Sequence, residues 1–101
     1  MIIIERQVQQ IYPTKWAELE ALDKKYNVVE ARLGFPPKKR CQALAGRLDM
    51  NTIIIERQWP SLAAMEAAYE KAMQDPEDLA LQAESASIIQ SNHWELYMPL
   101  P

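Results

Sequence analysis

The pattern of apolar and polar positions along the chain repeats. Residues 2–7 read Ile-Ile-Ile-Glu-Arg-Gln, and the same six residues return at 53–58. Each copy begins with β-branched residues and ends with polar ones, which is typical of a short strand. Each copy is followed by a proline, a hydroxyl residue and an amphipathic segment. The repeat therefore predicts two similar halves that both start as strand, turn and helix.

Three segments have apolar residues three and four positions apart, as helices do. We expect a first helix over about 13–27, a second that begins after Pro60, and a third over about 76–90. Ser61 is a suitable N-cap for the second helix. Asp75 is a suitable cap for the third, because Pro76 then takes its first position.

Two further strands complete the pattern. Residues 39–48 alternate loosely and residues 93–98 alternate regularly, as half-buried strands do. The element order β-α-β-β-α-α-β predicts an α+β, ferredoxin-like sandwich with a four-stranded antiparallel sheet. In its centre we expect the two repeated strands side by side and parallel. The helices cover one face of the sheet, and nothing in this chain covers the other.

Alternation along the strands sorts their side chains into two faces. We expect an apolar set to face the helices: Ile2, Ile4, Val8, Cys41, Ala43, Ala45, Ile53, Ile55, Trp59, Trp94, Leu96 and Met98. The opposite face then carries a polar set: Glu5, Gln7, Gln9, Arg40, Gln42, Glu56, Gln58, His93, Glu95 and Tyr97. This mixture suits a wet interior between two sheets, one from each copy of a homodimer.

Composition and charge limit the classes of function. A chain of 101 residues with 49% apolar and 25% charged residues suits one domain over 1–101. Its net charge of -3 argues against a nucleic-acid partner, because phosphate binding needs a basic surface. The single cysteine, Cys41, permits neither an internal disulfide nor a zinc cluster, and it fits a reduced, cytoplasmic location. The apolar run 1–4 is too short for a signal peptide or a membrane span.

The chain resembles the dimeric α/β-barrel superfamily, and within it the NIPSNAP-like and antibiotic-monooxygenase-like groups. The resemblance is carried by Gly34-Phe35-Pro36, the junction from Ile54 to Ala63, Asp75-Pro76-Glu77, and the ending Glu95-Leu96-Tyr97. It implies a homodimer whose two sheets pair face to face. It also implies a small organic ligand, in some members haem, held between sheet and helices.

The haem-degrading branch of this superfamily is similar to the chain at Trp59, where that branch has a tryptophan ahead of its second helix. That branch also uses an asparagine on the first strand and a histidine on a later helix. Here Gln7 or Gln9 stands for the asparagine, and no residue stands for the histidine. Haem degradation by that route is therefore not expected, and no cofactor is assigned.

Two carboxylates are candidates for acid–base chemistry. If the repeat is in register, Glu5 and Glu56 lie about 5 Å apart on adjacent strands and repel by about 3 kcal/mol at an effective dielectric of about 20. Such a pair shares a proton and can act as general acid and base. The alternative is that Arg40, His93 or a partner subunit neutralises both.

The other candidate residues belong to the same predicted pocket. His93, the only histidine, is either structural or a proton carrier, and one histidine does not make a metal site. We expect ligand contacts from Gln7, Arg40, Gln42, Gln58, Trp59 and Tyr97. The sequence has no Gly-rich phosphate loop and no nucleophile elbow.

These observations favour a homodimeric small-molecule-binding protein of the NIPSNAP-like kind. The alternative is a cofactor-independent enzyme that acts on a small aromatic or lactone substrate. It would be a monooxygenase or an isomerase, with Glu5, Glu56 or His93 as the proton carrier.

Overall fold

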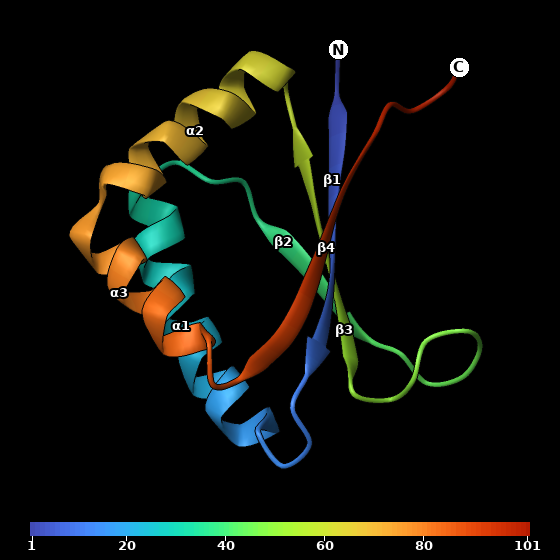
Figure 1. Ribbon diagram of the computed structural model, residues 1–101. Coiled ribbons are helices and arrows are strands. Elements are labelled where there is room, and N and C mark those ends of the chain that lie inside the picture. Colours follow the sequence, from blue (N-terminus) through green and yellow to red (C-terminus); the bar gives the residue numbers. More distant parts are fainter.

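Figure 1 shows the computed structural model of residues 1–101, in which one antiparallel sheet carries a layer of helices on one of its faces. Its elements follow the predicted order: β1 (Ile3–Ile11), α1 (Trp16–Arg32), β2 (Lys38–Gln42), β3 (Thr52–Trp59), α2 (Leu62–Gln74), α3 (Pro76–Ser85) and β4 (Ile89–Tyr97). The predicted α+β, ferredoxin-like architecture with a four-stranded antiparallel sheet is confirmed. None of the helices is long and apolar enough to cross a membrane.

Both predicted helix caps are present. The Ser61 hydroxyl accepts a hydrogen bond of 3.0 Å from the backbone N–H of Ala64, and the Asp75 carboxylate accepts one of 3.0 Å from the N–H of Asp78. These bonds satisfy N–H groups that the first turn of a helix leaves free. They fix where α2 and α3 begin. The third helix ends at Ser85, earlier than predicted, and the chain then enters β4.

Helix α1 begins and ends later than the pattern predicts. Thr14 has a φ of 72°, outside the helical region, so the helix starts only at Trp16. Its buried face continues as far as Val29, and Gly34, with a φ of 84°, follows its C-terminal end. The additional turn is important for the site because it contains Glu30.

The strand order in the sheet is β2-β3-β1-β4, and every neighbouring pair is antiparallel. The two repeated strands, β1 and β3, therefore lie side by side in the centre as expected. The prediction that they are parallel is wrong. Each helical crossover skips one strand, so β1 is parallel to β2, its partner across the crossover, while β3 lies between them.

The register overturns half of the predicted faces. Odd-numbered residues of both repeated strands face the helices, because Glu5 pairs with Arg57 and Ile3 with Trp59. The two hexapeptides start at an even and at an odd position, so they present opposite faces. The face assignment is correct for β3, and for Trp94 and Leu96 of β4, which lie on the helix side but are exposed rather than packed in the core; Met98 lies beyond the end of β4. The assignment is wrong for β1, where Ile2, Ile4 and Val8 face away from the helices, and for Cys41 on β2, while Ala43 and Ala45 lie beyond the end of that strand.

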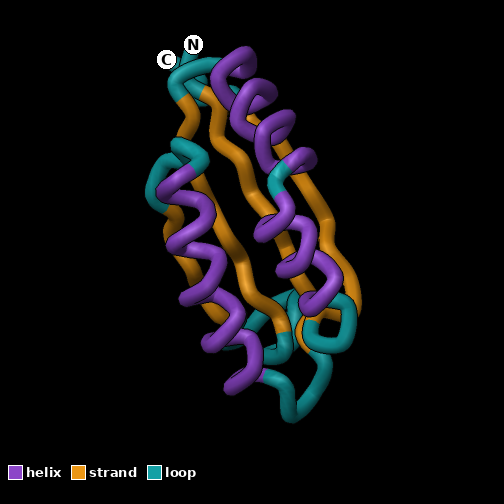
Figure 2. The backbone as a smooth tube through the Cα atoms, turned by 90° about the vertical axis from the view of Figure 1, so that its left-hand side faces the viewer, coloured by secondary structure: helices purple, strands orange, loops and turns teal.

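The helices lie together across one face of the sheet (Figure 2). Their main core contains Ile11, Leu19, Leu22, Val29, Ile53, Leu81 and Ile88, all buried. A smaller cluster contains Ile3, Trp59, Met65 and Ala68 at the other end of the sheet. Polar and charged side chains occupy the helix side between these two apolar clusters.

Candidate functional site

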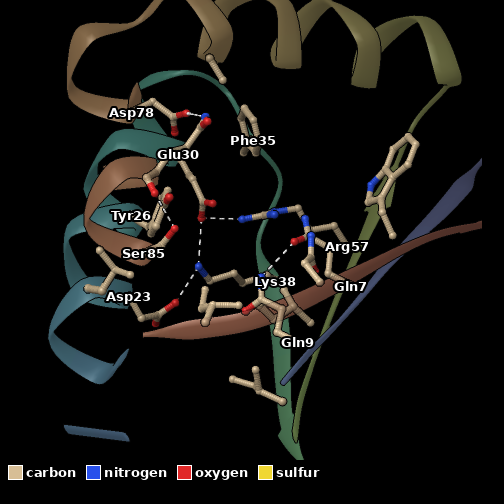
Figure 3. Close-up of a pocket in the computed structure, with 18 of the residues that line it drawn as sticks. Gln7, Gln9, Asp23, Tyr26, Glu30, Phe35, Lys38, Arg57, Asp78 and Ser85 are labelled. Carbon is tan, nitrogen blue, oxygen red and sulfur yellow. Dashed lines mark hydrogen bonds and ion pairs between the residues drawn. The ribbon is translucent and has the colours of Figure 1, made fainter. Parts of the chain in front are cut away.

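A cavity of about 800 Å³ lies between the sheet and the helices. Its walls combine apolar side chains such as Phe35, Ile55 and Met65 with charged and amide groups (Figure 3). The cavity reaches the edge strand β4, where two of its lining residues, Asn92 and Trp94, are exposed to solvent. A ligand can therefore enter along this edge.

Four charged side chains form one wall of the cavity, which we call the ionic wall: Asp23, Glu30, Lys38 and Arg57. Lys38 Nζ lies 2.7 Å from Asp23 Oδ1 and 3.0 Å from Glu30 Oε1. The Arg57 guanidinium forms an ion pair with the same oxygen of Glu30 (Figure 3). Asp23 and Glu30 are seven positions apart on α1 and therefore share one side of that helix. Two acids and two bases balance in charge, and they bind α1 to β2 and β3.

Every cation that lines the cavity forms an ion pair with a carboxylate. Arg57, 4% exposed, also donates from Nε to the carbonyl oxygen of Pro36 at 3.1 Å, and its guanidinium lies 5.1 Å from the centre of the Phe35 ring. Arg40 forms two hydrogen bonds, of 2.8 and 3.1 Å, with the Glu20 carboxylate. Each of these cations is already paired with a carboxylate, so the cavity has no unpaired cation for an anionic ligand.

Next to the ionic wall lies a buried carboxylate with no cation in contact. Glu5 is 1% exposed. Its oxygens accept hydrogen bonds from the indole N–H of Trp59 at 2.9 Å, the indole N–H of Trp94 at 2.7 Å, and the hydroxyl of Tyr69. Arg57 stands opposite Glu5 in the sheet, but its guanidinium is directed to Glu30. Neutral donors alone satisfy this carboxylate.

A chain of amides leads along β1 to Glu5. Gln9 donates from Nε2 to the Gln7 Oε1 at 3.2 Å. Gln7 in turn donates from Nε2 toward the Tyr69 hydroxyl oxygen at 3.4 Å and toward Glu5 at 3.5 Å. The last two contacts are long and weak compared with those of the indoles.

The cavity keeps its tyrosines protonated. Burial raises the pKa of Tyr69 well above its ordinary value of 10.0, and the hydrogen bond to Glu5 raises this pKa further. Burial, followed by the charge of Asp78, raises the pKa of Tyr26 to about 12. Both phenol groups are therefore neutral across the physiological range of pH.

The structure divides the predicted site residues between the two faces of the sheet. Five lie on the helix side: Glu5, Gln7, Arg40, Gln42 and Trp59. Of these, Gln7 and Arg40 line the cavity, Trp59 holds Glu5, and Gln42 donates to the Met50 carbonyl oxygen at the end of β2. The other four lie on the open face: Glu56, Gln58, His93 and Tyr97.

The predicted carboxylate pair does not form. Glu56 stands opposite Arg6 on the open face, with 3.9 Å between its Oε1 and the Arg6 Nε, whereas Glu5 is on the helix side. The prediction assumed parallel, in-register copies, and antiparallel pairing sets each glutamate against an arginine instead. Cys41, expected to be buried in the core, is exposed on the open face.

Sequence reasoning missed most of the ionic wall. Asp23 and Glu30 carry a signal, since their spacing places both on one helical face, but the helix was expected to end at residue 27. Arg57 was assigned to neither face. Trp94 was expected only to pack, and it also donates to Glu5. No group of three or more His, Cys, Asp or Glu side chains suits a metal ion.

The arrangement of the chain is similar to that of several solved structures. A NIPSNAP family protein from Agrobacterium tumefaciens aligns with a TM-score of 0.82 and 19% identity, over 98% of this chain and 86% of that one. A NIPSNAP-like domain protein from Burkholderia xenovorans aligns with a TM-score of 0.80 and 12% identity, over 98% and 85%. SnoaB, a cofactor-independent oxygenase from Streptomyces nogalater in its N63A form, aligns with a TM-score of 0.69 and 16% identity, over 97% and 92%. No family model and no curated protein matches the sequence. These likenesses confirm the predicted resemblance at the level of the fold.

The ionic wall predicts an asymmetric response to the loss of one carboxylate. Glu30→Gln leaves Lys38 and Arg57 without their shared anion in a poorly solvated place, so we expect the free energy of unfolding to fall by about 3 kcal/mol. Glu84→Gln is the control, because it removes the exposed pair with Lys25 and should cost less than about 1 kcal/mol. Urea denaturation of both variants measures the difference. Equal losses would show that the wall is no more than a surface pair.

Proposed function

We propose that this protein binds a small, uncharged organic molecule in the cavity between its sheet and its helices. The observation that carries the proposal is the cavity itself: about 800 Å³, lined by apolar side chains interspersed with polar groups that are held by hydrogen bonds and ion pairs. Cavities of this size and kind are usual for small ligands. The likeness to NIPSNAP proteins supports the fold around such a space, and it says nothing of which molecule enters.

The charge state of the ligand follows from the ionic wall. An anion would have to draw Lys38 or Arg57 away from Glu30, and a cation would meet carboxylates that are already paired. In both cases existing ion pairs would be weakened, at a cost in free energy that a neutral ligand avoids. Aromatic and aliphatic surface, such as Phe35 and Met65, then provides the attraction.

A pair of fluorescent probes tests this site. We expect the neutral probe N-phenyl-1-naphthylamine to bind about tenfold more tightly than its anionic relative 1-anilinonaphthalene-8-sulfonate, because the sulfonate must be desolvated next to committed cations. Asn92→Trp fills the cavity entrance on β4 and should weaken binding of the neutral probe. Ala80→Trp places the same bulk on an exposed position of α3 outside the cavity, and serves as the control. Equal effects of the two substitutions would place the probe elsewhere.

We propose further that the protein is a cytoplasmic homodimer, formed of one domain per copy, whose open sheet faces cover each other. The open face carries Ile4, Val8 and Ile54 among polar side chains, and no helix covers it. A mixed apolar and polar surface of this kind is usual at protein interfaces.

Dimer formation is tested by charging the open face. Val8 is at the centre of this face on β1, so Val8→Glu should raise the dimer dissociation constant by about a hundredfold or more. Val28→Glu makes the same change on α1, where Val28 is 70% exposed, and should leave the dimer intact. Sedimentation velocity measures both. A wild-type protein that is monomeric in dilute solution would refute the dimer.

The second candidate function is a cofactor-independent monooxygenase or isomerase that acts on a small aromatic or lactone substrate. The likeness to SnoaB favours it, together with a buried carboxylate beside the cavity. Among the three predicted proton carriers, Glu5 contacts the cavity lining through Tyr69 and Trp94, whereas Glu56 and His93 lie on the open face.

Catalysis is tested by oxygen uptake with 1,4-dihydroxynaphthalene, and by absorbance change with lactones. If Glu5 is the proton carrier, Glu5→Gln should lower kcat by about a hundredfold, whereas Glu56→Gln and His93→Gln should retain it. A wild-type protein that binds these compounds without converting them would leave binding as its function.

A further inference from the structure

The contacts of Glu5 fix the direction of every hydrogen bond around it. Its neighbours Trp59, Trp94 and Tyr69 approach with N–H or O–H groups, and a carboxylate that only accepts satisfies all of them at once. A glutamine side chain would turn an N–H against one of these donors. The Tyr69 hydroxyl therefore donates its hydrogen to Glu5 and not into the cavity.

The same direction continues along β1. Gln9 donates to Gln7, and Gln7 donates toward Tyr69 and Glu5, so each donor points to the carboxylate (Figure 3 shows Gln7 and Gln9 on the cavity wall). Two oxygen atoms among these groups keep free accepting positions. The hydroxyl oxygen of Tyr69 has only the long contact of 3.4 Å with Gln7, and Gln9 Oε1 accepts from no side chain.

We propose that Glu5 and Tyr69 make this wall of the cavity a hydrogen-bond acceptor, which selects neutral ligands that carry a hydroxyl or N–H donor. The ligand donates to the Tyr69 oxygen and displaces the weak contact with Gln7. Glu5 acts as a positioning residue, since its charge holds the tyrosine proton away from the cavity and increases the electron density on the phenol oxygen. The inference rests on the proposed ligand site and names the class of ligand that the site takes.

A matched pair of probes isolates this one hydrogen bond. 2-Naphthol and 2-methoxynaphthalene share one ring system, and only the first can donate. A site built around an acceptor discriminates against an analogue that leaves the acceptor unpaired. We expect 2-naphthol to bind the wild-type protein at least about tenfold more tightly than the ether, as measured by calorimetry.

Two variants test the assignment to Glu5 and Tyr69. Tyr69→Phe keeps the ring and removes the oxygen, so the preference for 2-naphthol should fall to about twofold or less while the ether binds as before. Glu5→Gln should reduce the preference as well, because the tyrosine proton is released from the carboxylate and becomes available to the ether oxygen. Tyr12→Phe, at an exposed tyrosine outside the cavity, is the control and should keep the full preference.

The outcomes separate this inference from the proposal on which it rests. If 2-naphthol and its ether bind the wild-type protein equally well, the acceptor wall is refuted while the ligand site stands. If neither compound nor the neutral fluorescent probe binds, both proposals fail. A preference that survives Tyr69→Phe would also overturn the inference, even if Glu5→Gln does not fold.

Discussion

The attachment of α1 to the sheet combines an apolar core with a group of ion pairs. Leu19, Leu22 and Val29 of α1 belong to the same buried cluster as Ile11 and Ile53 of the sheet. Between two apolar clusters, Asp23 and Glu30 of α1 reach Lys38 and Arg57 of the sheet, and this wall separates the layers by the length of charged side chains. Long side chains that meet at their tips leave space beside them, which close-packed aliphatic residues would fill. The cavity and its lack of unpaired cations follow from this arrangement.

Most of the fold could be predicted from the sequence because its signals are local. Ser61 and Asp75 mark helix starts through hydrogen bonds that span three residues, and the structure confirms both caps. Proline marks a helix start because its φ is already helical and it lacks the N–H that a first turn leaves free. The repeated hexapeptide identified the two central strands. Their direction required the path of the chain through space, and the pattern within each strand contains no information on it.

The candidate site was harder to predict because two strands, β1 and β2, were assigned the wrong faces: Arg40 and Gln42 of β2, expected on the open face, lie on the helix side. Three isoleucines in a row give β1 no alternation at its start. Only the polar residues that follow then indicate which face of β1 is buried. Their polarity favours the face away from the helices, because a helix-covered face is usually apolar. In fact Glu5, Gln7 and Gln9 face the helices, where indole and phenol groups donate to Glu5 and the two glutamine amides bond to each other. Distant residues such as Tyr69 and Trp94 supply these partners, and no spacing in the sequence reveals that they meet.

The pairing of the two hexapeptides also explains how the central strands find their alignment. An acid followed by a base is its own complement when two copies run in opposite directions, so Glu5 faces Arg57 while Arg6 faces Glu56. A slip of one residue in one direction would oppose Glu5 to Glu56, and a slip in the other would oppose Arg6 to Arg57. Like charges directly across a ladder are unfavourable, and a slip would also exchange the two faces of the strand. The repeated Glu-Arg dipeptide thus favours the observed alignment of β1 and β3 over the two alignments that are shifted by one residue.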